Sequence, residues 1–362
     1  MAYIFTSPGE YIQGKGEIKN IGKYAGKFGT NLLVLVDQYI YDNYKDLIDL
    51  NTEHNVYINY VIVSDECTYA EMEKAKNAFT DYDSDVVIGV GGGKTLDIAK
   101  GTSAYCDSPL VIVPTIASQD APCSRISVVY KENGEFDSFM THKKNPDIVL
   151  VDSMVIAKAP ARMLAAGMGD GLSTLFESRA CVASGTKNTA GGLPTNTAPM
   201  LARFCYQIIM ENGIAAYRAV ENNVVTKALD NVIEANIYLS GLGGEDTGDA
   251  GAHGMYDALT ILPECHAYLH GELVSFGILV QLVLENESAK VINEILDFNE
   301  AVGLPVCLAD IGVDKTNTEA LWKVAKAACE DTLQNMPFPV TAEDVYAAVI
   351  VADSFGSDHK KA

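Results

Sequence analysis

The stretch that decides the fold is Val86-Val87-Ile88-Gly89-Val90-Gly91-Gly92-Gly93-Lys94-Thr95-Leu96-Asp97-Ile98-Ala99-Lys100. Its apolar first part predicts a buried strand over 86–90, and residues 94–100 predict a helix. Glycines between a strand and a helix let backbone N–H groups approach a phosphate at the positive end of the helix. The stretch therefore predicts a strand, an anion-binding turn and a helix in succession.

Two familiar phosphate motifs each fail on one residue of this turn. A P-loop needs glycine at position 88, where Ile88 stands, and the dinucleotide fingerprint GxGxxG needs glycine at position 94, where Lys94 stands. Three consecutive glycines followed by Lys-Thr still favour a phosphate cradle over a plain tight turn. We interpret the turn as a glycine-rich anion cradle that belongs to neither motif.

Short apolar runs alternate with helical stretches around this turn. Such continuous apolar strands, separated by helices, indicate a parallel sheet that is covered on both faces. Asn133-Gly134 lies between two β-rich runs and predicts a hairpin. Further strands are predicted at 32–37, 56–63, 110–113 and 148–152, and a further helix at 71–80.

The character of the chain changes after Pro160. The following residues are rich in Ala, Leu, Met and Glu at helical spacing and have few β-branched runs. The length of 362 residues also exceeds the ~250–300 residues at which single cores stop growing. We expect a Rossmann-like α/β domain over 1–160 and an all-α domain over 161–362.

The composition excludes several classes of protein. The chain carries 26 Lys and Arg against 48 Asp and Glu, a net charge of −22, which argues against nucleic acid or an anionic membrane as the main partner. No stretch approaches the ~20 apolar residues of a membrane helix, and residues 1–9 lack the pattern of a secretory signal. Eight scattered cysteines without a CxxC pair are typical of reduced thiols. We expect a cytoplasmic protein.

Polar residues follow two of the predicted strands. Asp37 ends the strand at 32–37, where an acid can bind an adenosine ribose and repel a 2′-phosphate, which favours NAD over NADP. In the loop after the strand at 110–113, Thr115 and Ser118 suit phosphate or amide groups and Asp120 suits a polyol. The alternative is that these residues only cap turns.

Asp170, His253 and His270 are the candidate metal ligands. One carboxylate and two imidazoles without a thiolate suit a catalytic Zn²⁺ with an open fourth position. The alternative is a helix-capping role for Asp170 and a core or surface role for the histidines. Three of the six histidines fall between residues 253 and 270, which favours the metal site. We interpret the third, His266, as a second-shell or surface residue.

These motifs together resemble the glycerol dehydrogenase family of the iron-containing alcohol dehydrogenase superfamily. The likeness runs over nearly the whole chain, and its most specific parts are Asp120-Ala121-Pro122-Cys123-Ser124 and Ala157-Lys158-Ala159-Pro160-Ala161-Arg162. The resemblance implies a dehydroquinate synthase-like architecture with the active site in the cleft between the two domains. It also implies a homo-oligomer, with an octamer as one form.

The same resemblance assigns roles to individual residues. It implies Zn²⁺ on Asp170, His253 and His270, and polyol contact by Asp120. Thr174 stands where iron-dependent relatives carry a further histidine, which favours zinc over iron. NAD is implied to lie against Asp37, Gly93, Lys94, Thr95, Leu96, Asp97, Thr115, Ile116, Ala117, Ser118, Ser124, Ile126 and Tyr130.

The resemblance implies an NAD-dependent oxidation of glycerol and related vicinal diols, in which glycerol gives dihydroxyacetone. The expected binding partner is therefore a small neutral polyol substrate. Gln119, Tyr256 and Gly244-Glu245-Asp246-Thr247 depart from the family pattern, which leaves the preferred diol open. One alternative is a 2-hydroxy acid or other alcohol dehydrogenase on the same scaffold. Another is a sugar-phosphate cyclase of the dehydroquinate synthase type, a lyase, which the shortage of Lys and Arg near the metal candidates disfavours.

Overall fold

Six parallel strands form one sheet in the order β2-β9-β6-β5-β3-β4. The computed structural model describes residues 1–50, 54–63, 66–330 and 332–361. The five strands that the sequence predicts for this sheet are present, and the edge strand β2 is an additional one that the sequence analysis does not predict. The strands are β2 (Glu10–Gly14), β3 (Asn31–Asp37), β4 (Tyr57–Val63), β5 (Val86–Gly91), β6 (Leu110–Pro114) and β9 (Ile148–Asp152).

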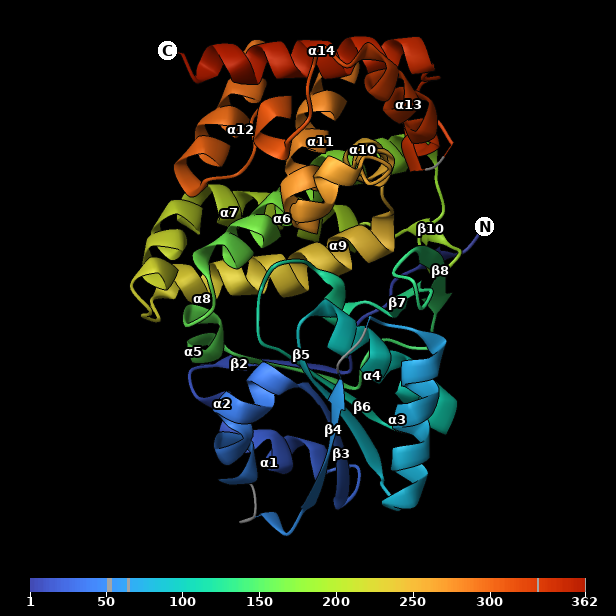
Figure 1. The fold of residues 1–362 in the computed structure, drawn as a ribbon, viewed down its shortest axis with the longest axis vertical. Helices are drawn as coiled ribbons and strands as arrows, with labels where there is room; N and C mark the ends of the chain where they lie inside the picture. Colours follow the sequence, from blue (N-terminus) through green and yellow to red (C-terminus); the bar gives the residue numbers. More distant parts are fainter. Residues whose placement is uncertain (51–53, 64–65, 331, 362) are drawn as a thin grey trace.

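Helices cover this sheet, and a hairpin projects beside it (Figure 1). The predicted helices at 71–80 and 94–100 are confirmed within longer ones, and the predicted hairpin is confirmed as the antiparallel pair β7 and β8. Gly134, in the hairpin turn, has a φ of +84°, which favours glycine. The elements are α1 (Ile21–Ala25), α2 (Gln38–Asp49), α3 (Tyr69–Asp81), α4 (Gly93–Cys106), β7 (Ile126–Tyr130) and β8 (Phe136–Thr141).

The C-terminal half is helical, as expected, and stacks on the carboxyl end of the sheet (Figure 1). Its first long helix begins directly after Pro160, whose fixed φ suits a helix start. The helices are α5 (Ser153–Ala157), α6 (Ala161–Ser184), α7 (Thr197–Glu221), α8 (Lys227–Glu234), α9 (Ser240–Thr247), α10 (Gly251–Leu259), α11 (His270–Leu284), α12 (Ala289–Val302), α13 (Thr318–Ala328) and α14 (Ala342–His359), with a π-helical turn at Ala235–Leu239. None of the helices in the described ranges is long and apolar enough to span a membrane.

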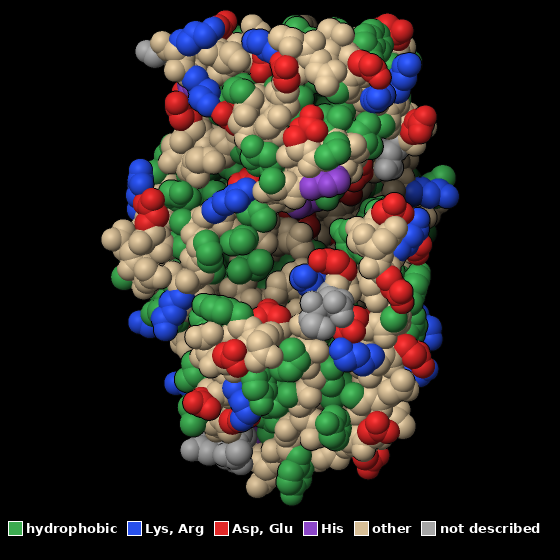
Figure 2. Space-filling view, in the orientation of Figure 1, with side chains coloured by type: hydrophobic (Ala, Val, Ile, Leu, Met, Phe, Trp, Pro, Cys, Tyr) green, Lys and Arg blue, Asp and Glu red, His purple; other side chains and the backbone are tan. Residues whose placement is uncertain are grey.

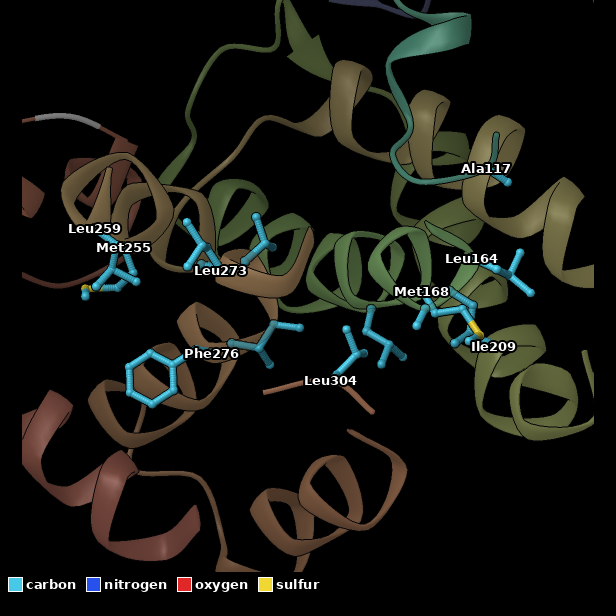
Figure 3. Packing of buried hydrophobic residues seen from close by; sticks show 14 of the residues in the cluster. Ala117, Leu164, Met168, Ile209, Met255, Leu259, Leu273, Phe276 and Leu304 are labelled. Carbon is cyan, nitrogen blue, oxygen red and sulfur yellow. The ribbon is translucent and has the colours of Figure 1, made fainter. Parts of the chain in front are cut away.

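Alternate residues of the strands enter two hydrophobic clusters, one on each face of the sheet. In β3, Leu33 and Leu35 belong to the larger cluster, whereas Leu32, Val34 and Val36 belong to the smaller one. The larger cluster continues from the sheet into the helical half, where Met168, Phe276 and other side chains interdigitate (Figure 3). Burial on both faces explains why the strands are continuously apolar rather than alternating.

The strand order reverses between β3 and β5, because the chain leaves β3 outward to β4 and returns to place β5 on its other side. In open parallel sheets, ligands bind at the carboxyl ends of the strands beside such a switch point. Asp37 ends β3, and Gly91 ends β5. The fold therefore places the predicted acid and the glycine turn side by side at the standard ligand position.

Candidate active site

Asp170, His253 and His270 converge from three helices of the C-terminal half. Asp170 lies in the middle of α6 and is 1% exposed, His253 lies on α10, and His270 is the first residue of α11. The Oδ1 atom of Asp170 lies 3.4 Å from Nε2 of His253 and 3.2 Å from Nε2 of His270. The sequence separates these residues by up to 100 positions, and packing of the helices brings them together.

The spacing of these atoms suits a small tetrahedral ion. Zn²⁺ bonds of about 2.0 Å to nitrogen and oxygen place neighbouring ligand atoms roughly 3.3 Å apart in a tetrahedron. The two distances from Asp170 match this edge length, and all three ligand atoms lie within 4.8 Å of one another. The residues therefore fit a zinc ion with a fourth position left for a substrate oxygen.

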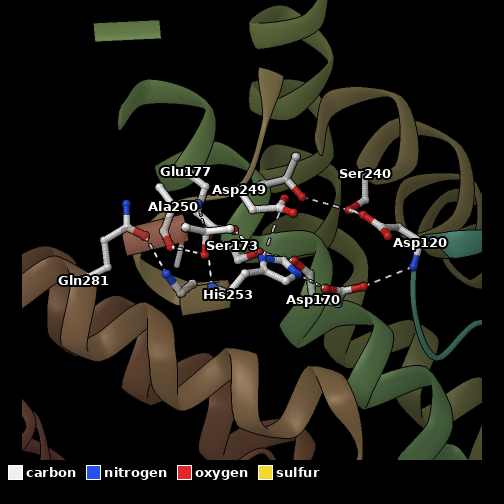
Figure 4. A network of polar contacts seen from close by, with 12 residues as sticks. Asp120, Asp170, Ser173, Glu177, Ser240, Asp249, Ala250, His253 and Gln281 are labelled. Carbon is white, nitrogen blue, oxygen red and sulfur yellow. Dashed lines mark hydrogen bonds and ion pairs between the residues drawn. The ribbon is translucent and has the colours of Figure 1, made fainter. Parts of the chain in front are cut away.

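Glu177 orients His253 from behind. It follows Asp170 by seven residues, two helical turns, so both carboxylates lie on one face of α6. One oxygen of Glu177 lies 2.7 Å from Nδ1 of His253, and the other accepts the backbone N–H groups of His253 and Ala250, each at 2.8 Å (Figure 4). A carboxylate on Nδ1 keeps the proton of the neutral imidazole on that nitrogen, so Nε2, which faces Asp170, is the nitrogen that can bind a metal.

The charges of this cluster favour a positive occupant. Burial opposes the charge of Asp170, but His270 and His253 hold its pKa below the ordinary value. Burial likewise opposes the charge of His253, yet Glu177 and Asp249 raise its pKa well above the ordinary value. The imidazole of His253, placed among these carboxylates, retains a proton readily, and a bound cation would take the place of that proton.

Asp120 joins the metal cluster to the loop that follows β6. Its backbone N–H donates to Oδ2 of Asp170 at 3.1 Å, and its own Oδ2 accepts from Ser240 of α9 at 2.9 Å (Figure 4). Ser240 also bonds Thr174 at 2.8 Å, so Thr174 is engaged with Ser240. Burial raises the pKa of Asp120 to about 7, and the neighbouring charge of Asp170 adds to the shift.

The glycine turn opens helix α4 without a side-chain cap. Gly92 is the N-cap residue and provides no side-chain cap, and no side chain in the described part of the chain bonds the N–H groups of residues 93–95. Asp37 lies beside it at the end of β3, where its Oδ1 caps α2 by accepting from Ile40 at 2.8 Å. The first amides of α4 thus face outward at the positive end of a 14-residue helix.

Other residues expected at the cofactor have structural contacts of their own. Lys94 forms an exposed ion pair with Glu66 at 3.0 Å. Asp97 is buried and holds Lys100 at 3.0 Å and the backbone N–H of Val128 at 3.0 Å. The remaining expected residues are buried or half-buried: Gly93, Thr95, Leu96, Thr115, Ile116, Ala117, Ser118, Ser124, Ile126 and Tyr130.

Lys100 is a structural cation that sequence reasoning missed. Its side chain is 1% exposed, and its Nζ donates to the carbonyls of Ala121 and Ile126, each at 2.8 Å, as well as to Asp97. The buried charge is satisfied by these acceptors, which fix the second half of the loop that carries Asp120. A lysine at the end of a predicted helix segment gave no signal of this role.

Comparison with known proteins agrees with this geometry. The pattern of the iron-containing alcohol dehydrogenases matches residues 8–153. A glycerol dehydrogenase from Thermotoga maritima is 44% identical over 98% of this chain and 97% of its own length. The chain belongs to the iron-containing alcohol dehydrogenase family. It is accordingly an oxidoreductase that acts on CH–OH groups.

Solved structures of family members superpose closely. The glycerol dehydrogenase of Schizosaccharomyces pombe has a TM-score of 0.95 at 32% identity, covering 99% of this chain and 92% of that one. A probable glycerol dehydrogenase of Sinorhizobium meliloti has a TM-score of 0.92 at 40% identity, covering 99% of this chain and 100% of that one.

Figure 2 shows a hollow between the two halves of the molecule, with histidine side chains on its wall.

Two departures from the family pattern border the metal cluster. The ring of Tyr256 packs edge-on against His270, with centroids 4.2 Å apart. A Cβ atom at Gly244 would lie 3.6 Å from Oδ2 of Asp120 and 3.9 Å from Oδ1 of Asp249. The absence of a side chain at Gly244 therefore leaves space between these two carboxylates.

Two further residues of the altered stretch bond residues of the N-terminal half. Glu245 is buried and accepts the backbone N–H of Arg125 at 3.1 Å. Asp246 accepts the backbone N–H of Thr6 at 2.8 Å. His266, in contrast, is exposed and donates to the carbonyl of Thr260 at 2.8 Å, so it is a surface residue.

Proposed function

We propose that this protein catalyses the NAD⁺- and Zn²⁺-dependent oxidation of glycerol and related vicinal diols, glycerol giving dihydroxyacetone. The observation that carries the proposal is the convergence of Asp170, His253 and His270 beside Asp120. The 44% identity to a glycerol dehydrogenase over nearly the full chain supports the choice of polyol.

Three protein ligands would hold the zinc ion, namely Asp170, His253 and His270. Zn²⁺ acts as a Lewis acid that lowers the pKa of a coordinated hydroxyl group. Thr174, where iron-dependent relatives are expected to carry a further histidine, bonds Ser240, which supports three ligands and zinc. Glu177 keeps His253 oriented for binding.

Asp120 would hold the substrate next to this centre. Ser240 fixes one of its oxygens, and the backbone of Asp120 is fixed by Asp170. The ionised form of Asp120, which a pKa of about 7 leaves populated at neutral pH, accepts hydrogen bonds from a hydroxyl of the polyol but repels the carboxylate of a 2-hydroxy acid. The residues around the cluster therefore select a neutral polyol over an anionic substrate.

The glycine turn would hold the diphosphate of NAD⁺. The cofactor accepts the hydride from the substrate. The uncapped amides at the start of α4 offer donors at the positive end of the helix. Asp37 would accept hydrogen bonds from the adenosine ribose, and its charge opposes the extra phosphate of NADP.

The test is an NADH absorbance assay on enzyme treated with EDTA, with and without added Zn²⁺, against glycerol, 1,2-propanediol, 2-hydroxy acids and simple alcohols. We expect zinc to restore activity, with glycerol and 1,2-propanediol oxidised fastest. A His270→Ala variant should lose both the metal and turnover. No NAD⁺ reduction with any diol, or full activity and metal content in His270→Ala, would overturn the proposal.

We further infer a homo-oligomer that works in the cytoplasm. All eight cysteines are free thiols, which supports a reducing compartment. Light scattering on the purified protein would give the number of subunits.

A further inference from the structure

Gln119 lies directly on the glycine turn. Its Nε2 atom lies 2.4 Å from the position that a Cβ atom of Gly93 would occupy, so any side chain at residue 93 would displace it. The neighbouring glycine is covered in the same way, since Cδ1 of Ile116 lies 3.3 Å from the Cβ position of Gly92. Two side chains of one loop thus rest on two consecutive glycines.

The loop reaches the turn because its strand is the neighbour of β5. Gly91 pairs with Pro114 in the register of β5 and β6, and the N–H of Thr115 donates to the carbonyl of Gly91 at 3.0 Å. Five residues after Pro114, the chain arrives at Gln119, immediately before Asp120. Gln119 therefore sits between the start of α4 and the metal cluster.

The amide group of Gln119 makes no hydrogen bond to any of the residues that the structure describes, and the side chain is half-buried. A carboxamide has two N–H donors, and both are available at this position. The first amides of α4 are uncapped beside it. Together the amide group of Gln119 and the N–H groups of residues 93–95 form a group of donors with no acceptor among the described residues.

We propose that Gln119 is a cofactor-binding residue whose Nε2 donates a hydrogen bond to the diphosphate of the dinucleotide. This inference rests on the proposed function, because it assigns the donors to NAD. It assigns a role to a residue at which this chain departs from the small hydroxyl residue expected from its family. The glycine at 93 is then required for a side chain of the protein as well as for the cofactor.

The test measures binding rather than turnover. NADH, ADP-ribose and AMP are titrated into the wild type, Gln119→Ala and the isosteric Gln119→Glu by calorimetry, without substrate. Loss of one hydrogen bond to a charged group should weaken NADH and ADP-ribose binding about tenfold or more in Gln119→Ala. Gln119→Glu should weaken both further, because a carboxylate would face the diphosphate. AMP, which lacks the diphosphate, should bind all three proteins within about twofold of one another.

A matched control removes an exposed glutamine from the helical half. Gln207 on α7 bonds Glu211 on the protein surface, so Gln207→Ala should bind NADH as the wild type does. Equal or tighter NADH binding by Gln119→Ala would overturn the inference and show that Gln119 only covers the turn. Failure of the wild type to bind NADH at all would instead overturn the cofactor of the proposed function.

Discussion

Replacing Glu177 by glutamine tests the metal centre through a residue that is not itself a ligand. Glu177 uses one oxygen for Nδ1 of His253 and the other for the N–H groups of His253 and Ala250. A glutamine has one acceptor and one donor end. If its oxygen keeps the two backbone N–H groups, its NH₂ group faces Nδ1.

That arrangement reverses the tautomer of the histidine. An NH₂ donor opposite Nδ1 requires the ring proton of His253 to lie on Nε2, the atom that faces Asp170. A protonated Nε2 cannot bind a metal. If glutamine turns the other way, its NH₂ group meets two backbone donors instead, so both orientations are unfavourable.

The expected cost is a 10- to 100-fold loss of zinc affinity, as for other outer partners of metal-binding histidines, which corresponds to about 1.4–2.8 kcal/mol. Zinc affinity is measured by competition with a chromophoric chelator, and kcat/KM at saturating zinc is measured in parallel. Glu287→Gln is the control, because Glu287 pairs with Arg179 away from the cluster. Zinc affinity equal to the wild type in Glu177→Gln would refute the tautomer argument.

Three further changes test other features. Asp37→Asn keeps the cap on the N–H of Ile40 but removes the charge, so the melting temperature should stay unchanged. The preference for NAD over NADP, measured as the ratio of the two kcat/KM values, should fall about tenfold. An unchanged ratio would leave Asp37 with its capping role alone. Burial lowers the pKa of His142 from 6.5 to about 4, so protonation of this residue favours the unfolded state and removes about 2 kcal/mol of its contribution to stability between pH 7 and pH 5. In urea unfolding, the stability of the wild type relative to His142→Gln should fall by this amount over that range, and a constant difference between the two proteins would contradict it. Gly244→Phe fills space that begins 3.6 Å from Asp120, so kcat/KM for a four-carbon polyol should fall about tenfold relative to kcat/KM for glycerol. If the ratio of these two kcat/KM values is the same in the variant and the wild type, that space lies outside the substrate pocket.

Local patterns in the sequence were sufficient for the turn and for five strands of the sheet, but not for its edge strand β2. Continuous apolar runs such as Leu32-Leu33-Val34-Leu35-Val36 report burial on both faces, because each residue type reflects its own surroundings. The hairpin at Asn133-Gly134 likewise depends on neighbours only. Helix lengths were harder to predict from the sequence, because α4 continues to Cys106 through residues whose burial depends on packing against distant parts of the chain.

The candidate active site could be predicted from the sequence only in part. Asp170, His253 and His270 were identified by residue type, but their convergence depends on how three helices pack. Glu177 was missed, although its spacing of seven residues from Asp170 on one helix was a usable signal. The contact of Gln119 with Gly93 had no sequence signal, because it joins two loops across neighbouring strands.

The loop over residues 115–126 has a consequence for how the protein unfolds. Lys100 holds it from the sheet side, while Asn236 from the helical side donates to the carbonyl of Ala117 at 3.1 Å. The first strand, Tyr3–Ile4, also pairs with Leu193–Pro194 in the helical half. Each half thus supplies contacts that hold elements of the other. The two layers should melt as a single cooperative body, so a destabilising change in the sheet also loosens the helices that hold the metal ligands.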